Sequence, residues 1–131
     1  MTCVLAVLLM TAATAWFAGA FVVQSSLMSD INGNGQKEMI LLVWKYGSFG
    51  KHRPSWIKED TTGLSQHIFI YEKRSDGWHP IWMSSALGMR IDSIREGDEI
   101  RGTGRPSLVI AEKNGRISRW GWLHWGLVNI D

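Results

Sequence analysis

The sequence lacks a second cysteine, and it lacks a strong excess of charge of either sign. Cys3 stands alone, so neither an intrachain disulfide nor a cysteine-based zinc site can form. The net charge is only +2 and the lysines and arginines are scattered, which argues against a nucleic-acid-binding surface. With 131 residues, of which 45% are hydrophobic and 20% charged, the chain has the composition of one globular domain.

Charge is also missing from the beginning of the chain, where the first charged side chain is Asp30. Residues 3–23 are uncharged, and we expect an N-terminal hydrophobic helix there. One interpretation is that residues 1–20 are a signal peptide with a small-x-small cleavage site at residues 18–20, although the usual basic start is absent. The other is an uncleaved membrane anchor through residues 3–23, because about 20 apolar residues can span a bilayer. Both interpretations predict a secreted or extracytoplasmic protein.

Motifs of catalysis are absent as well. The four histidines show no metal-ligand spacing, and there is no Gly-x-Ser-x-Gly elbow and no phosphate-binding glycine loop. Glu59 and Asp60 have no evident partner carboxylate of the kind that glycoside hydrolysis requires. We therefore expect a binding module rather than an enzyme; an accessory or hydrolytic domain acting on an extracellular polymer is the alternative. The histidines are His52, His67, His79 and His124, and we expect His67 and His79 to be neighbours on facing hairpin arms.

Short apolar runs separated by turn residues are what the sequence does contain. The Asp76-Gly77 and Asn114-Gly115 pairs predict hairpin turns, and Pro80 predicts an edge strand or a bulge. No convincing amphipathic helix follows residue 24, so we expect an all-β, antiparallel domain over residues 21–131. The expected strands cover residues 39–46, 67–73, 78–84, 89–94, the two arms of 106–122 and the tail 123–130, with a long loop at 47–66.

The chain contains an internal repeat with an offset of 69 residues. The stretch "DINGNGQKEMILL" at 30–42 can be placed over "EIRGTGRPSLVIA" at 99–111, with two coinciding glycine pairs, and an apolar strand follows each. A strand-like segment precedes each stretch. Each unit is then expected to consist of a strand, a polar loop, a strand and a hairpin, which is the pattern of a four-stranded blade.

The first of these loops resembles the FG-GAP or VCBS-type repeat of β-propellers. The hallmark of that family is Asp-x-Asp/Asn-Gly-Asp/Asn-Gly-x-x-Glu/Asp, and "DINGNGQKE" agrees at every diagnostic position, whereas "EIRGTGRPS" agrees only in its glycines and its proline. The resemblance implies a propeller-type fold, calcium in the loop, and extracellular binding or adhesion for residues 21–131. We expect a partial β-propeller of about one and a half blades, whose open sheet edges favour self-association.

The chemistry of the first loop points to a hard cation. Asp30, Asn32 and Asn34 alternate along the loop, and the carbonyl of Gln36 and the carboxylate of Glu38 follow at the next two alternate positions. Calcium takes six to eight oxygen ligands, and alternate side chains on a tight loop point inward together. We expect these five residues to hold one structural Ca²⁺ (the alternative is an Asn-Gly turn without a metal).

The loop is not an EF-hand, because Leu41 stands where an EF-hand needs a glutamate. Only two of the expected ligands are charged, which predicts weak binding, with a dissociation constant of roughly 10⁻⁴ to 10⁻³ M. In the second loop Arg101 and Ser107 replace two ligands, and we expect the Arg101 guanidinium to take the cation's place beside Glu99. The prediction is therefore one calcium per chain.

Two further segments are candidates for ligand recognition. Trp120 and Trp122 share a strand face, close to Trp125, and such aromatic rows either stack on sugars or fill space between sheets. The segment "KHR" at 51–53, between Phe49 and Trp56, is either a recognition loop or an ordinary solvated excursion. The expected partner is an extracellular protein or a glycan. A membrane-anchored structural subunit is a third interpretation of the chain.

Overall fold

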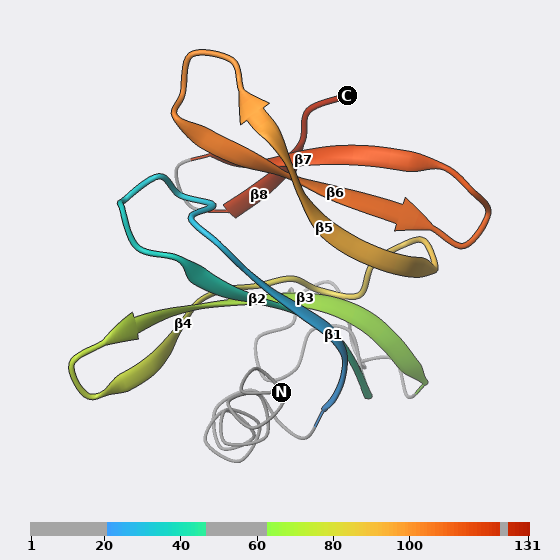
Figure 1. Ribbon diagram of the computed structural model, residues 1–131. Helices are drawn as coiled ribbons and strands as arrows, with labels where there is room; N and C mark the ends of the chain where they lie inside the picture. Colours follow the sequence, from blue (N-terminus) through green and yellow to red (C-terminus); the bar gives the residue numbers. More distant parts are fainter. Residues whose placement is uncertain (1–20, 47–62, 124–125) are drawn as a thin grey trace, which may run out of the picture.

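The computed structural model describes residues 21–46, 63–123 and 126–131, and all regular structure in them is β-strand. The strands form two four-stranded sheets, in the order β1-β2-β3-β4 and β5-β6-β7-β8, and every pairing is antiparallel (Figure 1). The first sheet contains β1 Val22–Ser29, β2 Glu38–Tyr46, β3 Leu64–Arg74 and β4 Gly77–Met83. The second contains β5 Ile91–Ile100, β6 Arg105–Glu112, β7 Ile117–Leu123 and β8 Gly126–Asn129.

The apolar run of β2 forms a strand because both of its faces are covered. Ile40 and Leu42 point toward the second sheet, where they meet Leu108 and Ile110 of β6. Residues on the opposite face of the first sheet form a separate apolar cluster, which we call the outer cluster. A strand buried on both faces shows a continuous apolar run rather than an alternation. The outer cluster consists of Phe21, Met39, Leu41, Val43, Phe69 and Tyr71.

The prediction of an all-β, antiparallel domain is confirmed, but the prediction of a partial second unit is wrong. The second unit has four strands, as many as the first, in the same order. Its loop has lost the expected cation ligands, yet its strands keep their apolar side chains. Strand formation depends on those apolar side chains and on the turns, so a degenerate loop does not imply an incomplete sheet.

Several local predictions can also be compared with the structure. β4 is an edge strand and its register shifts beside Pro80, as expected. The predicted N-terminal helix, as residues 1–20, lies outside the described residues, and the uncharged run does not continue as a helix to residue 23, because β1 begins at Val22. The described part of the chain contains no helix capable of crossing a membrane. The predicted loop ends earlier than expected, since β3 begins at Leu64; residues 47–62 are not described.

A buried amide joins the two sheets. Gln66 of β3 is 3% exposed, and its side chain accepts a hydrogen bond from the Ile91 amide at 2.7 Å and donates one to the Ile91 carbonyl at 2.8 Å. The same amide nitrogen also donates to Gln24 at 2.8 Å, and Gln24 donates to the Asp92 carbonyl at 3.1 Å. The beginning of β5 is thus held against the first sheet by side-chain amides in place of a neighbouring strand.

Candidate metal centre

The predicted metal loop connects β1 to β2 and is curled tightly. Gly33 and Gly35 have φ angles of 71° and 92°, in the left-handed region that favours glycine. The Gly33 amide donates to the Asp30 carbonyl at 3.1 Å, which closes the first turn. Ile31 is fully buried and anchors the loop in the core between the sheets. The polar residues around Ile31 are therefore held in a fixed arrangement by an apolar anchor.

The side-chain oxygens of the loop point inward, onto its own backbone amides. The two Asp30 carboxylate oxygens accept from the amides of Asn34 at 3.0 Å and Gly35 at 2.9 Å. Asn32 Oδ1 accepts from the Asn34 amide at 3.2 Å, and Asn34 Oδ1 accepts from the Gln36 amide at 2.9 Å. A carboxylate or amide oxygen that accepts one hydrogen bond has a second lone pair left. Each of these oxygens therefore has a lone pair that a further hydrogen-bond donor or a cation could occupy.

Glu38 is the first residue of β2, and its carboxylate reaches back to the backbone of the loop. It is 1% exposed, and Oε1 accepts from the Asn32 amide at 3.4 Å. The pKa of this carboxyl is raised from 4.5 to about 7, chiefly by burial and in smaller part by the negative charges of Asp30 and Glu72, against the lowering effect of the Asn32 and Ile31 amides. No lysine or arginine among the described residues forms an ion pair with it. A buried carboxyl without a positive partner is the kind of group that a metal ion satisfies.

The structure therefore brings Asp30, Asn32, Asn34 and Glu38 into one hydrogen-bonded loop. Gln36 joins it through its amide, and a role for its carbonyl stays a prediction. Across the described residues there is no group of three or more His, Cys, Asp and Glu side chains that would mark a metal site. The loop supplies only two carboxylates, so its donor set is completed by amide and carbonyl oxygens. That set suits calcium better than zinc or a transition metal.

The second loop, between β5 and β6, keeps the curl and loses the ligands. Gly102 and Gly104, which align with Gly33 and Gly35 in the repeat, have φ angles of 81° and 68°. Thr103 provides hydrogen-bond partners for two backbone groups of the loop. Its hydroxyl donates to the Ile100 carbonyl at 2.6 Å and accepts from the Arg105 amide at 3.1 Å. Arg101 is exposed, and no ion pair between it and Glu99 occurs in the described part. The prediction that Arg101 replaces the cation is wrong, because a short hydroxyl side chain already closes this loop.

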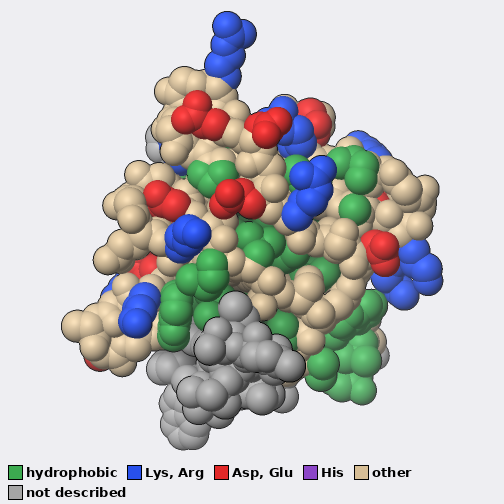
Figure 2. All heavy atoms as spheres, viewed as in Figure 1, with side chains coloured by type: hydrophobic (Ala, Val, Ile, Leu, Met, Phe, Trp, Pro, Cys, Tyr) green, Lys and Arg blue, Asp and Glu red, His purple; other side chains and the backbone are tan. Residues whose placement is uncertain are grey.

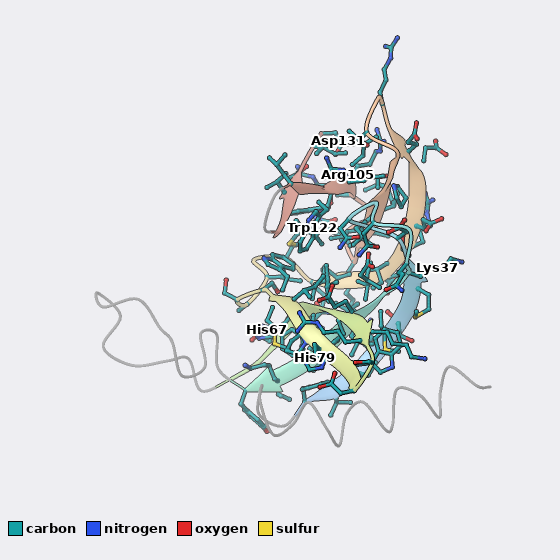
Figure 3. The ribbon with its side chains drawn as sticks, turned by 90° about the vertical axis from the view of Figure 1, so that its left-hand side faces the viewer. Lys37, His67, His79, Arg105, Trp122 and Asp131 are labelled. Carbon is teal, nitrogen blue, oxygen red and sulfur yellow. The ribbon has the colours of Figure 1, made fainter. Side chains whose placement is uncertain are left out.

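Sequence reasoning missed Arg105, which connects the first loop to the second sheet. Its aliphatic stem lies against Gly33, so close that a β-carbon there would be 2.6 Å from the Arg105 Cγ. Its guanidinium donates to the Trp122 carbonyl at 2.9 Å (Figure 3). A second connection is made by the buried Ser29, whose hydroxyl donates to the Glu96 carboxylate at 2.6 Å. No local sequence signal could reveal either contact, since each depends on how the sheets stack.

Substituting Gly33 by alanine tests this contact. We expect Gly33→Ala to lower the free energy of unfolding by about 2 kcal/mol, because alanine is strained at positive φ and its methyl group would displace Arg105. Gly104→Ala is the matched control, because its φ is similar and a β-carbon there would meet nothing within 4 Å. Urea unfolding of both variants measures the difference. Equal losses would show that the Arg105 contact contributes nothing.

The remaining candidates divide between packing roles and residues that the structure does not describe. Trp120 and Trp122 are half-buried against the core between the sheets, which favours their space-filling role.

His67 lies opposite Val43 and His79 opposite Glu72, roughly 16 Å apart along β3, so the prediction that they are neighbours is wrong. His67 is buried and bonded to Ser65 and Ser84, whereas His79 pairs with Asp76 at 2.6 Å. Phe49, Lys51, His52, Arg53, Trp56, Glu59, Asp60, His124 and Trp125 lie outside the described residues.

Comparison with known proteins adds no relative. No family model, no curated protein and no solved structure matches this chain. The resemblance to the FG-GAP and VCBS-type repeats therefore depends on the loop residues themselves, and any functional conclusion has to come from the geometry described above.

Proposed function

We propose that this chain is a calcium-stabilised binding module that acts outside the cytoplasm. The observation that carries the proposal is Glu38: a buried carboxyl at the base of a loop whose other side-chain oxygens already point inward. Without a cation, the charged form of Glu38 is disfavoured by burial and by the nearby Asp30. A bound divalent ion would stabilise the charged form of Glu38 and offset the cost of burying it. A turn without a metal does not require a buried carboxyl at this position.

Five residues would hold the ion. Asp30 and Glu38 would supply the charged oxygens, Asn32 and Asn34 the amide oxygens, and Gln36 its backbone carbonyl. The bound calcium would neutralise both carboxylates and tie the end of β1 to the beginning of β2. Because Arg105 lies against Gly33 in the same loop, an ordered loop would also support the packing of the second sheet on the first.

The expected strength of this site favours an extracytoplasmic location. With only two formal charges, its dissociation constant is expected in the range of roughly 10⁻⁴ to 10⁻³ M, which is typical of extracellular calcium modules. A site this weak would stay empty at cytosolic calcium concentrations. The uncharged residues 3–20 support the same conclusion, whether they act as a signal peptide or as an anchor.

The arrangement of the sheets supports the proposal of a partial propeller. Both units are four-stranded meanders, and the face of β2 with Ile40 and Leu42 packs on the face of β6 with Leu108 and Ile110. These two faces come from opposite sides of the repeat unit, as they do when blades stack in succession. The edge strands β1, β4, β5 and β8 each pair with a strand on one side only, although side-chain amides bond the beginning of β5, so we include self-association and an extracellular protein or glycan partner in the proposal.

Calcium titration tests the proposed function. We expect isothermal titration calorimetry to give one calcium per chain, and 10 mM calcium to raise the free energy of unfolding by about 1–3 kcal/mol. Glu38→Gln should abolish both effects, whereas Glu99→Gln should leave them unchanged, because it removes the same charge from the second loop. Binding of two ions, or binding that survives Glu38→Gln, would contradict the proposal.

A further inference from the structure

An open groove lies beside the metal loop, on the outer-cluster side of the first sheet. Its volume is about 640 Å³, and it is formed by the end of β1, the β1–β2 loop and the β3–β4 hairpin. The residues that matter here are Met28, Lys37, Lys73, Arg74 and Trp78. Basic and apolar side chains lie together over this part of the molecule (Figure 2). The volume is within the range of roughly 300–1,000 Å³ that is usual for small-molecule sites.

The charges around the groove are unbalanced. Arg74 is paired with Glu72 at 2.6 Å, and the neighbouring Asp76 is paired with His79 at 2.6 Å. Lys37 and Lys73 are exposed, and neither forms an ion pair with any carboxylate in the described part of the chain. Lys37 sits at the outer rim of the molecule (Figure 3). Lys37 stands two residues before Met39 and Lys73 two residues after Tyr71, and Met39 and Tyr71 are paired between β2 and β3, so the two lysines lie close together at one end of this strand pair. Two neighbouring ammonium groups without a carboxylate partner favour an anionic ligand.

The floor of the groove is apolar. Trp78 lies opposite Lys73 in the register of β3 and β4, and its half-buried indole packs against the outer cluster. Met28, at the end of β1, is 37% exposed on the same groove. A flat aromatic surface with cations beside it suits a ligand that is apolar on one face and negatively charged at its edge. An acidic sugar has that form, because its ring presents C–H groups on a face and its carboxylate or sulfate projects outward.

We propose that this groove binds an acidic sugar unit of an extracellular polysaccharide, with Trp78 under the ring and with Lys37 and Lys73 on its carboxylate or sulfate. The inference rests on the proposed binding function and supplies its ligand class. The proposed sugar groove and the proposed calcium loop are adjacent, since Lys37 of the groove directly precedes Glu38 of the loop. Calcium on Asp30 and Glu38 would make the groove more positive and would strengthen binding of the anion.

Titration with defined oligosaccharides tests the groove. The probes are hexagalacturonate, a heparin-derived hexasaccharide, neutral maltohexaose and hexaglutamate, each added to the chain with calcium and with a chelator. We expect the two acidic sugars, or one of them, to bind, and the neutral sugar and the acidic peptide to bind at least tenfold more weakly. A preference for hexagalacturonate identifies a carboxylate ligand, and a preference for the heparin fragment a sulfate. Equal binding of hexaglutamate would overturn the sugar assignment.

Matched variants locate the binding to the groove. Lys37→Gln combined with Lys73→Gln should weaken acidic-sugar binding about tenfold, and Trp78→Ala should weaken it about as much while circular dichroism shows the fold retained. Lys113→Gln combined with Arg116→Gln makes the same change of charge on the β6–β7 hairpin and should leave binding unchanged. If both double variants weaken binding equally, the attraction is non-specific and the groove is not the site.

The two proposals fail separately in this design. A chain that binds calcium but none of the acidic sugars would overturn the groove assignment and leave the calcium role intact. A chain that binds acidic sugars equally with calcium and with the chelator, and takes up no calcium, would support the groove and contradict the proposed calcium function.

Discussion

Replacing Gln66 by methionine should destabilise the protein by about 2–4 kcal/mol. The side-chain amide of Gln66 satisfies both the amide and the carbonyl of Ile91 in a buried place between the sheets. Methionine has a similar volume but can neither donate nor accept in the same way, so one buried donor and one buried acceptor would lose their partners. Each such group costs about 1–3 kcal/mol. Urea unfolding monitored by circular dichroism measures the loss.

A matched substitution distinguishes the loss of the Gln66 contact with Ile91 from the general effect of removing a glutamine between the two sheets. Gln24 belongs to the same network but is exposed, and water can replace its partners. Gln24→Met is therefore expected to cost less than about 1 kcal/mol. If the two variants lose the same stability, the Gln66 contact with Ile91 does not hold the sheets together, and the contacts made by Arg105 and Ser29 become the main polar links.

In the metal-free protein, we expect the contribution of Glu38 to the free energy of unfolding to fall as the pH rises from about 4.5 to about 7. The folded state raises the pKa of Glu38 from 4.5 to about 7, chiefly through burial. Within that window the folded chain keeps a proton that the unfolded chain releases, so a rise in pH favours unfolding. The contribution is fully present below pH 4.5 and fully lost above pH 7. Its size is at most about 3 kcal/mol.

Other groups also titrate in this range, so the prediction concerns the difference between two proteins. The wild type and Glu38→Gln would be unfolded by urea in a chelating buffer at a series of pH values. The free energy difference between them should change with pH only between about 4.5 and 7, in favour of the variant as the pH rises. A difference that stays constant would show that the Glu38 carboxyl has an ordinary pKa in the folded protein.

Much of the fold could be predicted because its determinants are local. The apolar run of β2, the hairpin turns next to Asp76 and around Asn114, and the bulge beside Pro80 follow from periodicity and turn chemistry, although Gly77, expected in the first turn, is already the first residue of β4. The repeat aligned the glycines of the two loops, and all four of these glycines have positive φ. The four strands of the second unit were expected from their own apolar runs, and only the description of that unit as a partial blade was wrong, because a degenerate loop does not imply a degenerate sheet.

The candidate site was predictable in part. The alternation of oxygen-bearing residues in 30–38 identified the loop, and the structure brings Asp30, Asn32, Asn34 and Glu38 together. The burial of Glu38 and the groove beside Lys37 and Lys73 were not predictable. Burial depends on what the second sheet and the hairpin place around a residue, and a sequence pattern contains no information about that arrangement.

The sequence by itself determined the strands, the turns and the two curled loops of this protein, because each is governed by interactions within a few residues. Only the tertiary structure decided how Gln66 meets Ile91, how Arg105 reaches Gly33, and which charges around the groove stay unpaired. These contacts arise when two sheets stack, and a small change in the stacking would exchange their partners. Hydrogen bonds and ion pairs act over a few ångströms, so the packing of the sheets decides which side chains meet.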